Sequence, residues 1–120
     1  MQLRVIENGK IKKLNDVKVG DLLLCEGGVY FPVKSIMIVS CYPMYYRASN
    51  NITFHMSTRT KIRTTDGFKI PELWDNIFVT EELTPTITTC TLLDRIMFFH
   101  DILIDGNLQS PEGIVFKYSD

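Results

Sequence analysis

The sequence predicts an all-β domain of many short antiparallel strands, with at most one short helical turn. Runs of Val, Ile, Thr, Tyr and Phe recur along the chain, and these residues are enriched in β-strands. Turn-forming dipeptides such as Asn8-Gly9, Gly27-Gly28 and Asp66-Gly67 separate the runs. No segment has the apolar spacing of an amphipathic helix. Together these observations favour a β-domain whose strands follow one another through tight turns.

The length and charge of the chain limit the classes of protein to consider. Its 120 residues are expected to form one domain, residues 1–120. Hydrophobic residues make up 45% and charged residues 22%, as in an ordinary globular protein. The 13 Lys and Arg residues nearly balance the 14 Asp and Glu residues, so no global field attracts long nucleic acids or a membrane surface. Any anion site must therefore be local.

Location and cofactor content follow from what the sequence lacks. No apolar run approaches the roughly 20 residues of a membrane span, and residues 1–7 lack the apolar stretch of a signal peptide, so we expect a cytoplasmic protein. Cys25, Cys41 and Cys90 are far apart, with no Cys-x-x-Cys pair and no neighbouring His at ligand spacing. We expect buried free thiols, no metal site and no cofactor.

The first quarter of the chain contains a hairpin and a sharp corner. Residues 3–7 and 10–14 are expected to pair around Asn8-Gly9, which tolerates the positive φ angles of a two-residue turn. Gly20 can adopt a backbone conformation that other residues avoid, and the Asp21 carboxylate can accept hydrogen bonds from nearby backbone N–H groups. The pair is expected to turn the chain into a buried strand at residues 22–25.

The middle of the chain predicts a long run of strand formers and two hairpins. Pro32 interrupts the run at residues 29–39 early, which indicates an edge or a bulge. Residues 44–48 and 52–56 are expected to pair around Asn50-Asn51, and residues 60–64 and 68–70 around Asp66-Gly67.

The last third is expected to hold the one helical turn and four strands. Residues 71–75 start with Pro, which is favoured at a helix start, and predict the turn. Strands are expected at residues 76–79, 87–93 and 114–118. The continuous apolar character of residues 95–105 predicts a long buried strand, in which residues 96–99 lie in the core.

These segments, in this order, resemble the Hint fold, the self-processing β-domain of hedgehog C-terminal domains and inteins. The resemblance implies the family's entry hairpin, its central block ending in Asp-Gly-aromatic, and its C-terminal block. The matching segments are Asn8-Gly9-Lys10-Ile11-x-x-Leu14 followed by 19–21, then 63–68, then 100–107 followed by 113–115.

Self-processing in that family uses a Cys or Ser at the first residue, a Thr-x-x-His pair and a terminal His-Asn whose amide cyclises. On the resemblance, the Thr-x-x-His positions correspond to Ser57 and Thr60, and the terminal positions to Lys117 and Tyr118.

The resemblance leaves the rest of this machinery without counterparts. The chain begins at Met1, already inside the entry strand, with no room for the nucleophile, and Asp101 remains as the single matching polar residue. The resemblance therefore implies a Hint-like scaffold with no catalytic residue, which is not an enzyme and does not cleave or splice itself.

A polar and aromatic region between residues 42 and 64 is the candidate binding region. Arg and Lys pair with phosphate, Ser and Thr hydroxyls add hydrogen bonds, and Tyr or Trp faces can stack on a base. On the Hint resemblance, residues 57–60 line the former active-site cleft. The predicted ligand-binding residues are Tyr45, Arg47, Ser57, Arg59, Thr60, Lys61, Arg63 and Trp74.

Structural explanations compete with this interpretation. Lys61 and Arg63 fit equally the solvent face of a half-buried strand whose Ile62 faces inward. His55 and His100 are expected to be packed or surface histidines, and Trp74 fits an exposed edge as well as the core.

Two functions remain open. The first is a non-catalytic binder of a small phosphate-bearing ligand, such as a nucleotide or cyclic nucleotide, acting as a homo-oligomer. Viruses of bacteria encode small sponge proteins that sequester cyclic-nucleotide immune signals for immune evasion, and the analogy rests on size and composition. The alternative is a protein–protein interaction or structural module on an inactive Hint scaffold, using a free strand edge or apolar patch.

Overall fold

Tight turns set the bounds of most strands in the computed structural model of the chain, which describes residues 2–79 and 84–118. Asn8 and Gly9 have φ angles of 49° and 76°, as the two-residue turn of a hairpin requires. A single 3₁₀ turn, η1, covers Leu14–Asp16. The strands are β1 (Arg4–Glu7), β2 (Lys10–Lys13), β3 (Leu22–Cys25), β4 (Val29–Pro32), β5 (Ser35–Cys41), β6 (Met44–Ala48), β7 (Thr53–Met56), β8 (Thr60–Thr64), β9 (Gly67–Lys69), β10 (Ile87–Leu92), β11 (Met97–Leu103), β12 (Leu108–Gln109) and β13 (Val115–Tyr118).

The strands form three antiparallel sheets. The largest has the order β2-β1-β3-β12-β13-β8-β9, with β4 paired to β3. A second sheet has the order β10-β6-β7, and β11 pairs with β5 to form a two-stranded sheet. The chain is therefore all-β with short antiparallel strands, as the sequence predicted.

The Gly20-Asp21 corner has the predicted structure. Gly20 has a φ of 92°, and Asp21 Oδ2 accepts hydrogen bonds from the backbone N–H of Lys18 and from Lys12 Nζ, both at 2.9 Å. The bond from Lys12 is the main reason that the pKa of Asp21 lies below its usual value. The corner leads directly into β3, in which Leu23 and Cys25 are buried.

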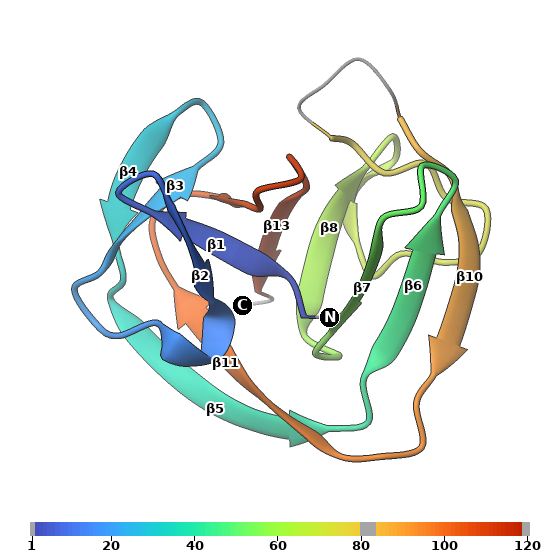
Figure 1. Cartoon of the computed structure of the whole chain (residues 1–120), viewed down its shortest axis with the longest axis horizontal. Coiled ribbons are helices and arrows are strands. Elements are labelled where there is room, and N and C mark those ends of the chain that lie inside the picture. Colours follow the sequence, from blue (N-terminus) through green and yellow to red (C-terminus); the bar gives the residue numbers. More distant parts are fainter. Residues whose placement is uncertain (1, 80–83, 119–120) are drawn as a thin grey trace.

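The ribbon of β5 and β11 connects two halves of the molecule. Figure 1 shows it running along the outside, from the half that holds β1–β4 to the half that holds β6, β7 and β10. Buried side chains from both halves form one hydrophobic cluster, which includes Tyr46, Ile62, Leu108 and Phe116. Gly106 has a packing role, because a Cβ there would come within 2.7 Å of Phe31 and 2.8 Å of Cys25.

The predicted core position of residues 96–99 is wrong for two of its residues. Phe99 is buried, but Ile96 and Phe98 are 58% and 63% exposed. The reason is that the ribbon packs one of its faces on the interior, so alternate side chains of an apolar run point to solvent.

Pro32 interrupts the run at 29–39 and ends the outer strand β4, as the sequence predicted. Two further predictions for local structure are corrected. Residues 71–75 form a turn closed by a bond from Asp75 N to Glu72 O, not a helical turn. Residues 76–79 contribute isolated bridges at Asn76 and Ile77 in place of a strand.

The cysteine side chains follow the prediction in part. All three thiols are free, but Cys25 is buried whereas Cys41 and Cys90 are partly exposed. Burial raises the pKa of Cys25 to about 11. Among the described residues, no group of His, Cys, Asp or Glu side chains could hold a metal ion, and no helix is long and apolar enough to cross a membrane.

Candidate functional site

The turn between β7 and β8 brings two hydroxyl groups together. Ser57 Oγ lies 2.9 Å from Thr60 Oγ1, and it also accepts a hydrogen bond from the backbone N–H of Arg59 at 3.3 Å. Both side chains are buried. The hydroxyls are therefore partners of one another and of the turn backbone.

Asp101, near the middle of β11, completes this cluster. Ser57 Oγ donates to Asp101 Oδ1 at 3.1 Å, so Thr60 must be the donor to Ser57. Ser57 Oγ then donates one hydrogen bond and accepts two, which uses its full capacity. Ser57 Oγ is therefore fully engaged by Thr60, Asp101 and the turn backbone.

Arg59 covers the buried carboxylate from the solvent side. Arg59 Nε lies 3.4 Å from Asp101 Oδ2, and the Asp101 side chain is 4% exposed against 39% for Arg59. Burial raises the pKa of Asp101, while the bond from Ser57 and the charge of Arg59 oppose that rise. The positive charge of Arg59 is compensated within the cleft.

A hollow of about 220 Å³ opens beside this pair, between β5, β11 and the end of β13. Met37, Arg59, Asp101 and Tyr118 contribute to its walls. Tyr118 pairs with Thr60 across β13 and β8, and its buried hydroxyl has no hydrogen-bond partner within residues 2–79 and 84–118. No histidine belongs to the described lining of this hollow.

His55 is buried on β7, where it packs edge-on against Phe99 with ring centroids 6.3 Å apart. Burial lowers the pKa of His55 to about 4, so its ring is neutral at neutral pH. The structure therefore confirms a packed histidine, as the sequence predicted.

A second group of charged side chains lies on the outer side of β8 and β13. Lys61 and Lys117 are directly opposite each other in the strand register. The Arg63 guanidinium carbon and Lys117 Nζ lie 4.8 Å and 4.7 Å from the centre of the Phe68 ring. We call Lys61, Arg63, Phe68 and Lys117 the basic face.

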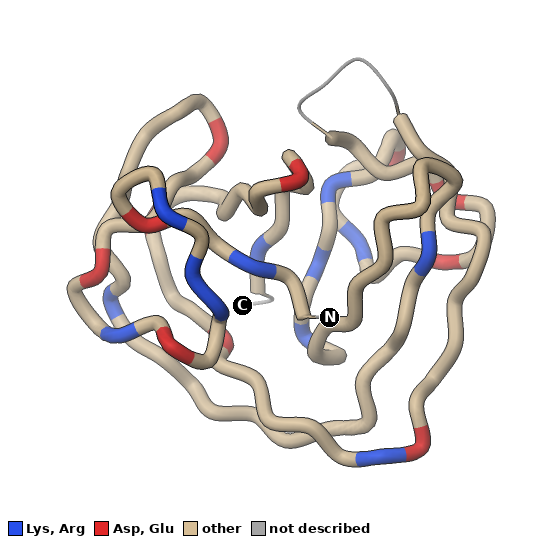
Figure 2. Tube along the Cα trace, in the orientation of Figure 1, with Lys and Arg blue, Asp and Glu red and all other residues tan. Residues whose placement is uncertain are grey.

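The basic face carries more positive than negative charge. Arg63 pairs with Glu26, whereas neither Lys61 nor Lys117 forms a salt bridge with any described residue. Figure 2 shows basic positions along β8 beside one on β13. A hollow of about 180 Å³, lined by residues 102–108, Lys117 and Tyr118, adjoins this face. Lys61 and Lys117 together could contact one anion.

The predicted site residues separate into three places. Ser57, Arg59 and Thr60 meet in the cleft, and Lys61 and Arg63 lie on the basic face. The other three lie elsewhere: Tyr45 and Arg47 on β6, and Trp74 in the turn that bonds to Ile87.

Trp74 is 67% exposed and has a φ of 73°. This backbone conformation is unfavourable for any residue other than glycine. Of the two positions that the sequence left open for it, the exposed one is observed.

Sequence reasoning missed Lys117 and Phe68 as members of a site. Lys117 lies 56 positions after Lys61, and nothing in the local sequence shows that β13 pairs with β8. The alternation of Phe116, Lys117 and Tyr118 is a signal for an outward-facing lysine, but not for its neighbour.

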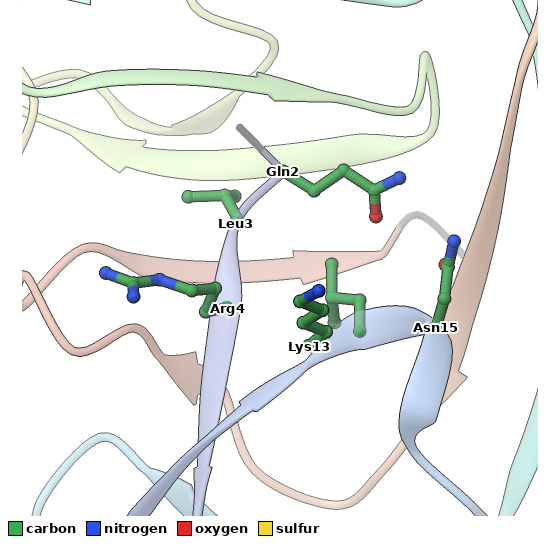
Figure 3. A pocket seen from close by; sticks show the side chains of 6 residues that line it. Gln2, Leu3, Arg4, Lys13 and Asn15 are labelled. Carbon is green, nitrogen blue, oxygen red and sulfur yellow. The ribbon is translucent and has the colours of Figure 1, made fainter.

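A hollow of about 320 Å³ lies where β1 begins and η1 follows β2. Figure 3 shows the side chains of Gln2, Leu3, Arg4, Lys13 and Asn15 around it. The side-chain amides of Gln2 and Asn15 both donate to Phe98 O, at 3.3 Å and 3.2 Å. These two bonds attach Gln2 and η1 to β11. No predicted site residue lines this hollow.

The chain resembles known proteins in structure but not in sequence. No protein-family model matches the chain, and no curated protein matches it by sequence. The gp41-1 intein superimposes with a TM-score of 0.79 at 15% identity, covering 98% of this chain and 94% of the intein. This chain has the Hint fold. The DnaB intein from Synechocystis sp. PCC 6803 gives a TM-score of 0.75 at 15% identity, over 98% and 94% of the two chains. The Msm DnaB1 intein splicing domain, whose structure was solved with zinc bound, gives 0.76 at 18% identity, over 98% and 97%.

The residues of the cleft include positions that the Hint resemblance assigned to the self-processing site. The resemblance assigned Ser57 and Thr60 to the Thr-x-x-His positions and Tyr118 to the terminal one, and these three residues lie next to each other here. Asp101, the matching polar residue, is hydrogen-bonded to Ser57. At identities of 14% to 18% the likeness concerns the fold alone.

Proposed function

We propose that this chain is a non-catalytic Hint-fold binding protein that takes a phosphate-bearing small ligand on its basic face. The observation that carries the proposal is the pair of lysines, Lys61 and Lys117, in one register pair without a described counter-ion. Like charges directly opposite on neighbouring strands destabilise a sheet, and an anion bound between them removes that repulsion.

The chemistry of the cleft supports the absence of self-processing. The resemblance assigns Ser57 and Thr60 to the positions of the Hint Thr and His, and the Ser57 hydroxyl has its full set of hydrogen bonds. A nucleophile needs a neighbouring base that takes its proton. The family uses His for proton transfer, and no histidine belongs to the described lining of the cleft.

The cleft is a poor phosphate site compared with the basic face. A phosphate that approached Arg59 would meet the carboxylate of Asp101 3.4 Å away from the same guanidinium. On the basic face, Lys61 and Lys117 have no such competitor among the described side chains, and Glu26 pairs with Arg63. The phosphate group is therefore assigned to Lys61 and Lys117.

Nucleotides and cyclic nucleotides are the ligand class that we propose to test first. The Phe68 ring is in contact with Arg63 and Lys117, so it is not a free platform for a base. Recognition on this face is therefore expected to depend on phosphate more than on base identity, as in a protein that sequesters a signal.

Titration of the purified protein with mono-, cyclic di- and cyclic trinucleotides, with inorganic phosphate alongside, tests the ligand. A ligand at about 100 times its Kd should add about 2.7 kcal/mol to the free energy of unfolding. The Lys61→Ala/Lys117→Ala variant should lose at least about tenfold in affinity, and added salt should weaken binding further. The Lys10→Ala/Lys18→Ala variant is the matched control, because both lysines are exposed and lie elsewhere. Arg59→Ala should bind normally; if it alone abolishes binding, the site is in the cleft.

Absence of self-processing is tested by the intact mass of the full-length protein after prolonged incubation, with and without a thiol. An unchanged mass is expected. A cleaved, truncated or ligated product would overturn the non-catalytic assignment, whatever the ligand titration shows.

A protein-interaction role is the second candidate function. It is favoured by a separate observation, the uncharged open edge of β5, which lies on another sheet.

A further inference from the structure

Strand β5 is an unprotected sheet edge. Within the described residues it pairs with β11 alone, so the backbone groups on its other side are available for pairing. The seven residues Ser35–Cys41 contain no charge and no proline. Natural proteins usually block such edges with Lys, Pro, a bulge or a covering loop, because an open edge pairs with other strands.

Several large apolar side chains of the ribbon are exposed, beside the exposed Ser35 and Ser40 of β5. Met37 and Ile38 on β5 are 52% and 67% exposed, and Phe98 and Leu103 on β11 are similarly exposed. A two-stranded sheet is marginal by itself, whereas sheets of three or more strands with an apolar face are stable. The ribbon therefore gains from the addition of strands.

We propose that β5 pairs in an antiparallel manner with β5 of a second copy of this chain, which joins two ribbons into one four-stranded sheet. The absence of charged residues on β5 favours a second copy of the chain as its partner. A two-fold axis places the same strand on both sides of the interface, and a strand without charges meets its copy without repulsion.

The length of β5 fixes the register of this pair. If all seven residues pair, the axis passes through Ile38, the central residue, which is 67% exposed. In this register Lys34 of one copy lies opposite Tyr42 of the other, and not opposite a second Lys34. A lysine beside a tyrosine ring is a favourable contact.

The interface is independent of the basic face, since β5 and β8 belong to different sheets. Dimerisation should therefore occur without nucleotide, and disrupting it should leave ligand affinity unchanged. The two proposals can fail separately.

The test is the solution mass of the full chain by sedimentation, from micromolar to near-millimolar concentration. The wild type should form a dimer, and Ile38→Lys and Ile38→Glu should each be monomeric, because the axis places two like charges opposite each other. Val19→Lys is the matched control, since Val19 is equally exposed in a loop, and it should remain dimeric. Thermal unfolding of each variant verifies that it folds.

Mixing the two Ile38 variants gives the decisive result. If residue 38 faces residue 38, equimolar Ile38→Lys and Ile38→Glu should form a heterodimer that dissociates as salt is raised. A monomeric wild type at the highest concentration overturns the proposal, as does a dimer that survives Ile38→Lys. Failure of the mixed variants to associate overturns the antiparallel register.

Discussion

Lys61 and Lys117 face each other across β8 and β13, so two cations occupy a register pair in which opposite charges would be stabilising. The Lys117 ammonium contacts the Phe68 ring, but no salt bridge to either lysine is found within the described residues. This pair is the structural basis of the proposed anion site.

Replacing one of these lysines should stabilise the free protein. Lys61→Glu creates a cross-strand ion pair with Lys117 and leaves the contact of Lys117 with Phe68 in place. We expect the free energy of unfolding in urea to rise by about 0.2–1 kcal/mol, with a smaller gain at high salt. Lys61→Gln should give part of the gain, and Lys18→Gln, at an exposed position outside the strands, should give none; a destabilised Lys61→Glu would contradict the repulsion.

Ser57→Ala should destabilise the cleft. The substitution removes the hydroxyl that donates to Asp101 Oδ1 and accepts from Thr60 and the Arg59 N–H. The loss should be about 1–3 kcal/mol in chemical unfolding, because buried partners are left unsatisfied. Thr58→Ala, at an exposed position of the same turn, should have little effect. Equal losses in both variants would show that the turn, and not the cluster, is responsible.

Asp101 should make the protein relatively more stable in acid. Burial raises its folded-state pKa, so the folded protein holds this proton more tightly than the unfolded chain does. The resulting stability is present below about pH 4, the ordinary value, and is lost as pH rises through the raised value. Asp101→Asn keeps an oxygen acceptor for Ser57 and abolishes the titration. The difference in unfolding free energy between wild type and variant should therefore shift against the wild type with rising pH, by about 1.4 kcal/mol per unit of pKa change.

His55 should act in the opposite direction. Burial lowers its pKa to about 4, so below its ordinary value of about 6.5 the unfolded chain binds the proton better. The stability that neutral His55 contributes is complete above about pH 6.5 and is lost as pH falls towards about 4, with a maximal loss of about 3 kcal/mol. His55→Phe, which keeps an aromatic ring beside Phe99, should remove this dependence. An NMR titration of the His55 ring gives the pKa directly, and an ordinary value would refute the prediction.

The local parts of the fold could be predicted because short-range chemistry determines them. Asn8-Gly9 and Gly20-Asp21 formed the expected turns because their backbone angles suit few other residues. The burial of residues 96–99 was not predictable, since a continuous apolar run does not reveal which of its faces the protein covers. Phe98 points outward because it alternates with Phe99, whose side of β11 packs into the interior.

The candidate site was predictable to the extent that its residues are close in sequence. Ser57, Arg59 and Thr60 belong to one turn, and the structure places them together. Lys117 comes from a distant strand, and its position beside Lys61 depends on the order of strands in the sheet. The charge of Arg59 is compensated by Asp101, which is also a long-range contact that the sequence does not reveal. For this reason the sequence favoured Arg59 as an anion ligand.

The order of strands in the large sheet has a consequence for synthesis. In the described chain, β3 and the β8–β9 hairpin are joined through β12 and β13, which are made last. The early strands cannot assemble into the complete sheet while the ribosome still holds residues 108–118. Until these residues have left the ribosome, β3 and β8 keep unpaired edges that β12 and β13 later cover, so the chain is sensitive to crowding by neighbouring nascent chains.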